Sequence, residues 1–175
     1  EHLSQLGGGD ARVGLELDPT VIGNPYHFAF IGSSDSHNST SPIEEDNYHG
    51  KLPLIDGTPE QRLDIKPASE LHRGLGRIMS AQGLAAVWAT GNTREAIFDA
   101  LRRGETYATS GPRIGLRVFG GWGYEQALLG DLAYLDKAYA GGVPMGGDLT
   151  ARPADAGAPR LLIRAAKDPD GANLD

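Results

Sequence analysis

Short apolar runs alternate with longer polar stretches over the first half of the chain. The run YHFAFIG, Tyr26 to Gly32, is aromatic and bounded by proline and glycine, which predicts a buried strand. The run GLAAVWA, Gly83 to Ala89, predicts a second buried strand, and ARVGLEL, Ala11 to Leu17, fits the last turns of a helix. Between the two strands, from Ser33 to about Met79, polar residues and prolines predict a long loop, and such loops are usually functional or mobile.

The stretch GNTREAIFDALRRGE has the clearest helical pattern in the sequence. Asn92 is a good N-cap residue, and Glu95 stands three positions later, as in a capping box. A charged pair, Asp99 and Arg103, is spaced i to i+4, and a glycine follows the last turn. One apolar stripe is formed by Ala96, Ile97, Ala100 and Leu101. These signals predict a helix from Thr93 to Arg103.

The second half is richer in strand signals. TYATSG, Thr106 to Gly111, and RIGLRVFGG, Arg113 to Gly121, are both typical of strands, and RLLIRAAKD, Arg160 to Asp168, is a further candidate. YEQALLGDLAYLDKAYAGG fits either an irregular helix broken at Gly130 or a loop. The order strand, loop, strand, helix, strand predicts an α/β fold, followed by a β-rich, glycine-rich tail after about Arg113.

Composition narrows the class of protein. The 175 residues suit one domain, or one domain with part of another, and the formal charge of −7 with no basic block argues against nucleic acid or an anionic membrane as partner. The absence of cysteine excludes disulfides and thiolate sites but fits both a cytoplasmic and a periplasmic location. No apolar run is long enough to span a membrane. Both ends of the sequence suggest a piece of a longer chain.

Candidate chemistry begins in FAFIGSSDSHNST, where the apolar run stops at Gly32. Asp35 and His37 are spaced i to i+2, so side chains leaving a strand end there would point to the same side. A carboxylate oxygen with an imidazole nitrogen suits zinc, manganese or iron. The alternative is that the serines, Asp35 and Asn38 are turn formers, with His37 a surface histidine.

Two further segments offer polar groups. In EEDNYHGK, His49 and Lys51 are candidates for an acid, a base or a ligand, but a solvated charged loop explains the same residues. In YATSGPRIG, hydroxyls, backbone N–H groups and a guanidinium from Thr109, Ser110 and Arg113 fit an oxyanion. The Ser-Gly-Pro turn explains those residues equally well without a ligand.

Four segments together resemble a known family. In order and at similar spacing, they resemble the C-terminal part of the domain of unknown function 3604, which is itself similar to the polymerase and histidinol phosphatase (PHP) metal-dependent phosphoesterases. The segments are GNPYHFAFIGSSDSHN, EEDNYHGK, GLAAVWATGNTREAIFDALRRGETYATSGPRIGLRVFGGWGY and GVPMGGDL with AKDPDGANLD.

The resemblance implies a fold and a metal site. Residues 1–112 would form the C-terminal part of a PHP-like distorted (β/α) barrel, and residues 113–175 a truncated β-rich extension. The family's Gly-Ser-Asp-x-His type motif falls on Gly32, Ser34, Asp35 and His37, which makes Asp35 and His37 metal ligands and catalytic residues. The family's His-x-His motif and middle ligands have no counterpart in this sequence, so the site would be incomplete and this piece inactive by itself.

The resemblance also implies a class of reaction. The whole protein would be a metal-dependent hydrolase of a small anionic substrate, and a phosphoester is the favoured substrate. Related metal barrels also cleave amides and sulfate esters, so these bonds are the alternative. Substrate contacts would come from Arg94, Thr109, Ser110 and Arg113, with His49 and Lys51 as lid residues. The alternative is a non-catalytic scaffold or binding module on a degenerate barrel. A piece with half a barrel is also expected to expose apolar strand edges or to self-associate.

Overall fold

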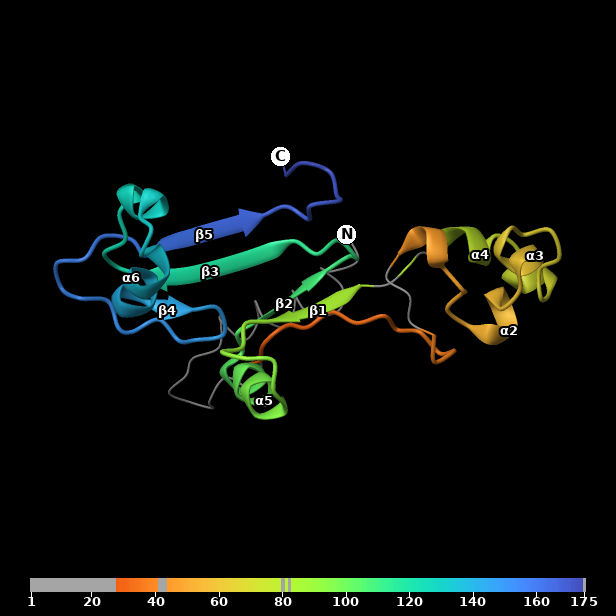
Figure 1. Cartoon of the computed structure of the whole chain (residues 1–175), viewed down its shortest axis with the longest axis horizontal. Helices are drawn as coiled ribbons and strands as arrows, with labels where there is room; N and C mark the ends of the chain where they lie inside the picture. The colour runs from red at the N-terminus through yellow and green to blue at the C-terminus, as the bar shows by residue number, and fades with distance from the viewer. Residues whose placement is uncertain (1–27, 41–43, 80, 82, 175) are drawn as a thin grey trace.

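The computed structural model describes residues 28–40, 44–79, 81 and 83–174. Three groups of elements follow one another along the long axis of the molecule: a lobe of short helices, a strand pair with one long helix, and a three-stranded sheet (Figure 1). The predicted helix end at Ala11–Leu17 and the first residues of the strand predicted at Tyr26–Gly32 lie outside the described residues.

The lobe replaces the long structureless loop predicted between the first two strands. Its elements are α2 (Pro53–Asp56), α3 (Pro59–Arg62) and α4 (Leu75–Ile78), with single 3-10 turns at Glu45–Asn47 and Glu70–His72. Both α2 and α3 begin with proline at the first helical position, where the missing N–H is not needed. Each helix is one turn long, too short for a 3.6-residue periodicity to be visible in the sequence.

The strand pair and its helix confirm the clearest predictions. Strand β1 (Leu84–Val87) pairs antiparallel with β2 (Thr106–Thr109), and α5 (Arg94–Arg103) connects them. The cap differs by one residue from the prediction, because the hydroxyl of Thr93, not Asn92, accepts from the Ala96 N–H at 3.2 Å. The expected pair of Arg103 with Asp99 is replaced by a pair with Glu105, whose carboxylate lies 2.8 Å from the guanidinium.

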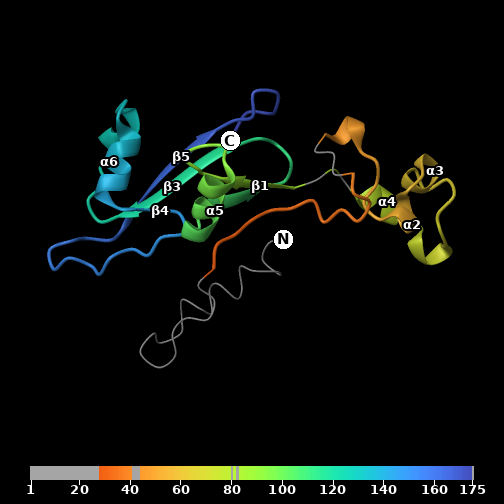
Figure 2. The same ribbon diagram turned by 60° about the horizontal axis from the view of Figure 1, so that its bottom comes forward.

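The prediction of a buried strand at Tyr26–Gly32 is wrong for residues 28–32, the part of it that the structure describes. Residues 28–32 form no strand and their aromatic side chains are exposed rather than buried. The segment is extended and lies against the β1–β2 pair in both views (Figures 1 and 2), but it is held by the Thr106 hydroxyl, which donates to the Phe30 carbonyl at 2.7 Å, and not by a ladder.

The second sheet has the order β4-β3-β5 and is antiparallel throughout. Its strands β3 (Gly115–Gly121) and β5 (Arg160–Ala166) confirm two predictions, and β4 (Val143–Pro144) is short. Of the two alternatives left open for YEQALLGDLAYLDKAYAGG, the broken helix is the one found, as a 3-10 turn at Gln126–Gly130 followed by α6 (Tyr134–Gly141). The buried core of this part consists of Phe119, Tyr124, Ala138 and Leu162.

The fold class is confirmed at the coarse level, because helices are mixed with two small antiparallel sheets. Over the described ranges the strands close no barrel, so the PHP-like barrel and the division at residues 112 and 113 stay predictions. The described residues also include no helix that is both long and apolar enough to span a membrane.

One buried carboxylate joins the two sheets. Glu105 is 4% exposed, and its two oxygens accept from the Arg103 guanidinium and, at 2.6 Å, from the Tyr139 hydroxyl on α6. Tyr139 in turn accepts from Arg117 of β3, whose guanidinium lies 3.8 Å from the centre of the Trp88 ring. Burial first, and then the bond to Glu105, raise the pKa of the Tyr139 hydroxyl.

We expect Tyr139→Phe to lower the free energy of unfolding by about 1.5–3 kcal/mol, because one oxygen of a buried carboxylate loses its donor. Urea unfolding followed by tryptophan fluorescence measures the change. The control is Tyr134→Phe on the same helix, which keeps the ring that lies 4.2 Å from the Arg164 guanidinium. Equal stability of the two variants would contradict a structural role for the Glu105 link.

Candidate functional site

The segment at residues 28–32 and strand β2 run side by side in the same direction. Phe30 lies beside Thr106, and Gly32 lies beside Ala108. A Cβ at Gly32 would lie 2.5 Å from the Leu84 carbonyl oxygen and 2.9 Å from the Ala108 Cβ, so only glycine permits this approach. The residues that follow the segment and those that follow β2 therefore emerge at the same end of the strand pair, the kind of place where α/β proteins put their sites.

Asp35 and His37 lie at that end. The Asp35 Oδ1 and His37 Nε2 atoms are 3.5 Å apart, and the Asp35 backbone takes a left-handed conformation with φ of 50°. Lys51 joins them, with its Nζ 2.6 Å from the other oxygen, Oδ2, of Asp35. The structure thus brings together three residues that the sequence separates by up to sixteen positions, and leaves the Asp35 and His37 side chains 70% and 58% exposed.

Two hydrogen bonds tie together the loops that supply these side chains. The backbone N–H of His37 donates to the Lys51 carbonyl at 2.9 Å, and the side-chain amide of Asn38 donates to the Gly50 carbonyl at 2.6 Å. The Asn38 side chain also accepts from the Ser36 hydroxyl at 2.7 Å. The turn that contains Asp35 is therefore held in place relative to Lys51 by these two hydrogen bonds.

Asp56, a residue that sequence reasoning missed, fixes the Lys51 loop. Its side chain is fully buried and accepts from the backbone N–H groups of Lys51 and Leu52 at 2.8 and 2.7 Å, and from the Tyr48 hydroxyl at 2.9 Å. Arg62 donates to its carbonyl at 2.9 Å. The available signal was an acidic residue in the first turn after a proline, which is a helix-start pattern.

Lys51 dominates the electrostatics of the group. Its hydrogen bond and its charge, followed by the hydrogen bond to His37, hold the pKa of the Asp35 carboxyl below its usual range. Asp35 presents one carboxylate oxygen to the Lys51 ammonium and the other to the His37 imidazole.

The donor set fits a divalent metal in part. Two ligand atoms at a tetrahedral ion with bonds of about 2.1 Å lie about 3.4 Å apart, and the Asp35 oxygen and His37 nitrogen are 3.5 Å apart. A carboxylate with an imidazole is also an ordinary ligand pair for zinc, manganese or iron. Within the described ranges, no group of three or more His, Asp or Glu side chains is placed to hold an ion.

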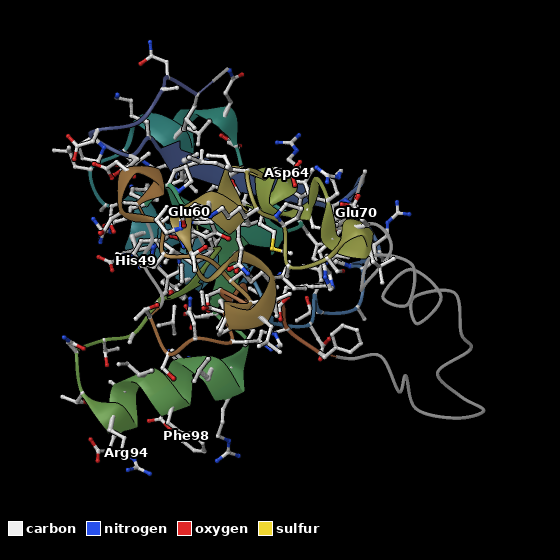
Figure 3. The ribbon with its side chains drawn as sticks, turned by 90° about the vertical axis from the view of Figure 1, so that its right-hand side faces the viewer. His49, Glu60, Asp64, Glu70, Arg94 and Phe98 are labelled. Atoms are coloured by element: carbon white, nitrogen blue, oxygen red, sulfur yellow. The ribbon has the colours of Figure 1, made fainter. Side chains whose placement is uncertain are left out.

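Two other predicted site residues lie apart from this group. His49 is exposed and is held through its carbonyl, which accepts from Arg62 at 3.1 Å. Arg94 is the first residue of α5, which follows β1 in the chain. The last residue of β1, Val87, pairs with Thr106 at the start of β2, so Arg94 follows the end of the strand pair opposite to Thr109. Figure 3 shows Arg94 at the outer end of α5, away from His49.

Two of the three remaining predicted residues, Ser110 and Arg113, line a separate cleft. Ser110 and Arg113 face a cavity of about 300 Å³ that Glu44 and Asp168 also line. The Arg113 guanidinium lies 3.9 Å from Glu44, and the Arg113 N–H donates to Asp168 at 2.5 Å. The hydroxyl of Thr109 accepts from the Gly111 N–H at 3.3 Å. The backbone donors predicted for an oxyanion are thus used in part by the chain's own acceptors.

Comparison with known protein families gives a match over most of the chain. The family described as "Protein of unknown function (DUF3604)" matches residues 9–175, which is nearly the whole chain. Neither the comparison with curated proteins nor that with solved structures gave a match.

We expect Gly32→Ala to lower the free energy of unfolding by about 1–3 kcal/mol, because the added methyl group overpacks against the Leu84 backbone. Thermal melting by circular dichroism measures the loss. Gly91→Ala is the matched control, since a Cβ there meets nothing within 4 Å. If both variants melt like the parent, the segment does not lie against the strand pair as described.

Acid is expected to weaken the hydrogen bonds that the backbone N–H groups of Arg113 and Asp170 donate to Asp168. Hydrogen bonds from the backbone of Arg113 and then Asp170 hold the pKa of Asp168 below its ordinary value of 3.8. A depressed pKa in the folded state stabilises the fold above pH 3.8, and this stabilisation is lost as the pH falls through the lower folded value.

The free energy of unfolding of the parent should therefore fall more steeply below pH 3.8 than that of Asp168→Asn. Urea unfolding at a series of pH values from 5 downward measures both slopes. Asp155→Asn removes the same charge from an exposed turn and should keep the slope of the parent. Parallel curves for the parent and Asp168→Asn would be inconsistent with these bonds.

Proposed function

We propose that this chain, which belongs to the DUF3604 family, supplies two metal ligands, Asp35 and His37, to the site of a metal-dependent hydrolase. The observation that carries the proposal is the approach of Asp35 Oδ1 and His37 Nε2 to 3.5 Å, at the end of the strand pair where an extended segment and β2 both terminate. The resemblance of the Gly-Ser-Asp-x-His segment to PHP phosphoesterases supports the same assignment, with the PHP-like barrel as the proposed fold of the complete site.

The chain's own residues would do three things at this site. Asp35 and His37 would hold zinc, manganese or iron through an ionised carboxylate and an imidazole, and Asp35 would serve as a proton acceptor. Asn38 fixes the turn that presents them, through its bond to the Gly50 carbonyl. A divalent ion bound there supplies Lewis acidity and makes water a better nucleophile at neutral pH.

The substrate class that best fits is a small anion, with a phosphoester as the favoured case. Lys51 places an ammonium group beside Asp35, and Arg113 turns a guanidinium to the cleft beyond β2 next to Ser110. The overall charge of −7 favours a small anion over a polyanion such as nucleic acid. We assign Arg94 no contact with this anion, because it lies at the other end of the strand pair.

The test is metal content. We expect the chain, dialysed to equilibrium against Zn²⁺, to hold more zinc by inductively coupled plasma mass spectrometry than the Asp35→Ala, His37→Ala double variant dialysed against the same solution. The control is His72→Ala, which removes an imidazole that lies 2.9 Å from the Ser69 hydroxyl in the helical lobe. Equal metal in the parent and the double variant, or none in the parent, would overturn a metal site built on these residues.

The second candidate function is a non-catalytic scaffold or binding module. It is favoured by the second sheet, where Leu161 and Ile163 of β5 are exposed on the face that also holds Val118. The same face fits the expected self-association of the chain. A metal-free protein with unchanged stability in the double variant would favour this second function over the hydrolase.

A further inference from the structure

The Asp35–Lys51 pair is more rigidly built than an ordinary surface ion pair. Most exposed pairs join two side chains that are free to separate. Lys51 is instead anchored at both of its backbone polar groups: its N–H donates to buried Asp56, and its carbonyl accepts from the His37 N–H. Its side chain is 29% exposed, and its ammonium lies 2.6 Å from Asp35 Oδ2. The backbone hydrogen bonds of Lys51 therefore position its side chain next to the Asp35 carboxylate.

That placement has a consequence for any cation that uses Asp35. Asp35 has two oxygens, and the ammonium holds one of them while the other faces His37. A divalent ion must either take the oxygen that Lys51 holds or bind to the other oxygen of the same carboxylate. In the first case it displaces the ammonium, and in the second it is repelled by a positive charge a few ångströms away. Lys51 opposes the ion in both cases.

We propose that Lys51 is a built-in counter-cation that occupies Asp35 until a divalent metal ion takes the carboxylate and releases the ammonium. This inference rests on the proposed metal site at Asp35 and His37. It assigns Lys51 a role different from that of a lid: it stabilises the ionised carboxylate in the metal-free chain and sets how tightly the site binds metal. Asp56 is a positioning residue, because it holds the backbone of Lys51 in this register.

The experiment titrates Zn²⁺ into the chain by isothermal calorimetry, with Lys51→Met, Lys51→Arg and Lys66→Met as variants. We expect Lys51→Met to bind Zn²⁺ about tenfold more tightly than the parent, the size of the repulsion between a divalent and a single charge at a few ångströms in water. Lys51→Arg keeps the cation and should bind like the parent. Lys66→Met removes an equal charge from an exposed position of the same lobe and should also bind like the parent.

A second measurement separates release of the ammonium from simple repulsion. Amine-reactive labelling of Lys51, quantified by mass spectrometry against Lys66, should rise when Zn²⁺ is added to the parent. It should already be high in Asp35→Asn without metal, because that variant lacks the carboxylate that holds the ammonium. Labelling of Lys51 that does not change with Zn²⁺, in a chain that binds the ion, would overturn the exchange.

The outcomes distinguish this inference from the function on which it rests. If Zn²⁺ binds the parent, is lost in the Asp35→Ala, His37→Ala variant, and binds Lys51→Met no more tightly, the metal site stands and the role of Lys51 is overturned. If Zn²⁺ binds both chains and binds Lys51→Met about tenfold more tightly than the parent, the metal site and the counter-cation role are both supported. If neither chain binds Zn²⁺, both the metal site and the exchange are overturned.

Discussion

The burial of the Glu105 carboxylate is the constraint on which the arrangement of the two sheets depends. A carboxylate that is 4% exposed must be hydrogen-bonded, and its partners come from α5 through Arg103 and from α6 through Tyr139. Its backbone N–H donates to the Ala100 carbonyl and its carbonyl accepts from the Trp88 N–H. One residue thus fixes the end of α5, the start of β2 and the approach of the second sheet.

A second buried carboxylate, that of Asp56, plays the corresponding part in the helical lobe. It gathers the backbone of Lys51 and Leu52 and so presents Lys51 to Asp35. The two carboxylates act at different places: Glu105 positions the strand pair that receives the Gly32 segment, and Asp56 positions the loop that meets that segment at its end. The candidate site lies between these two fixed parts, with its own side chains exposed to solvent.

The sequence predicted the individual residues of the candidate site, but it did not predict which of them lie together in the structure. The i to i+2 spacing predicted that Asp35 and His37 would point to the same side on leaving a strand. Their atoms do approach, but in a turn where Asp35 has a φ of 50° and not at a strand end. The pairing of Lys51 with Asp35 was beyond sequence reasoning, because it depends on a buried residue in a one-turn helix. Arg94 was grouped with Thr109 as a substrate contact under the family resemblance. The antiparallel pairing of β1 and β2 places the end of β1, which leads to Arg94, opposite the start of β2, away from Thr109.

The sequence by itself determined the elements whose signals are local. The cap, stripe and terminal glycine specify α5, and alternating or β-branched runs specify β3 and β5, since these depend on neighbours within a few residues. Only the tertiary structure decided that residues 28–32 lie extended against a strand pair instead of forming a strand, and that Gly32 must lack a side chain there. The reason is physical. The close approach of the Gly32 backbone to the Leu84 carbonyl oxygen depends on the packing of segments that are far apart in the chain, and a local sequence pattern contains no information about such packing.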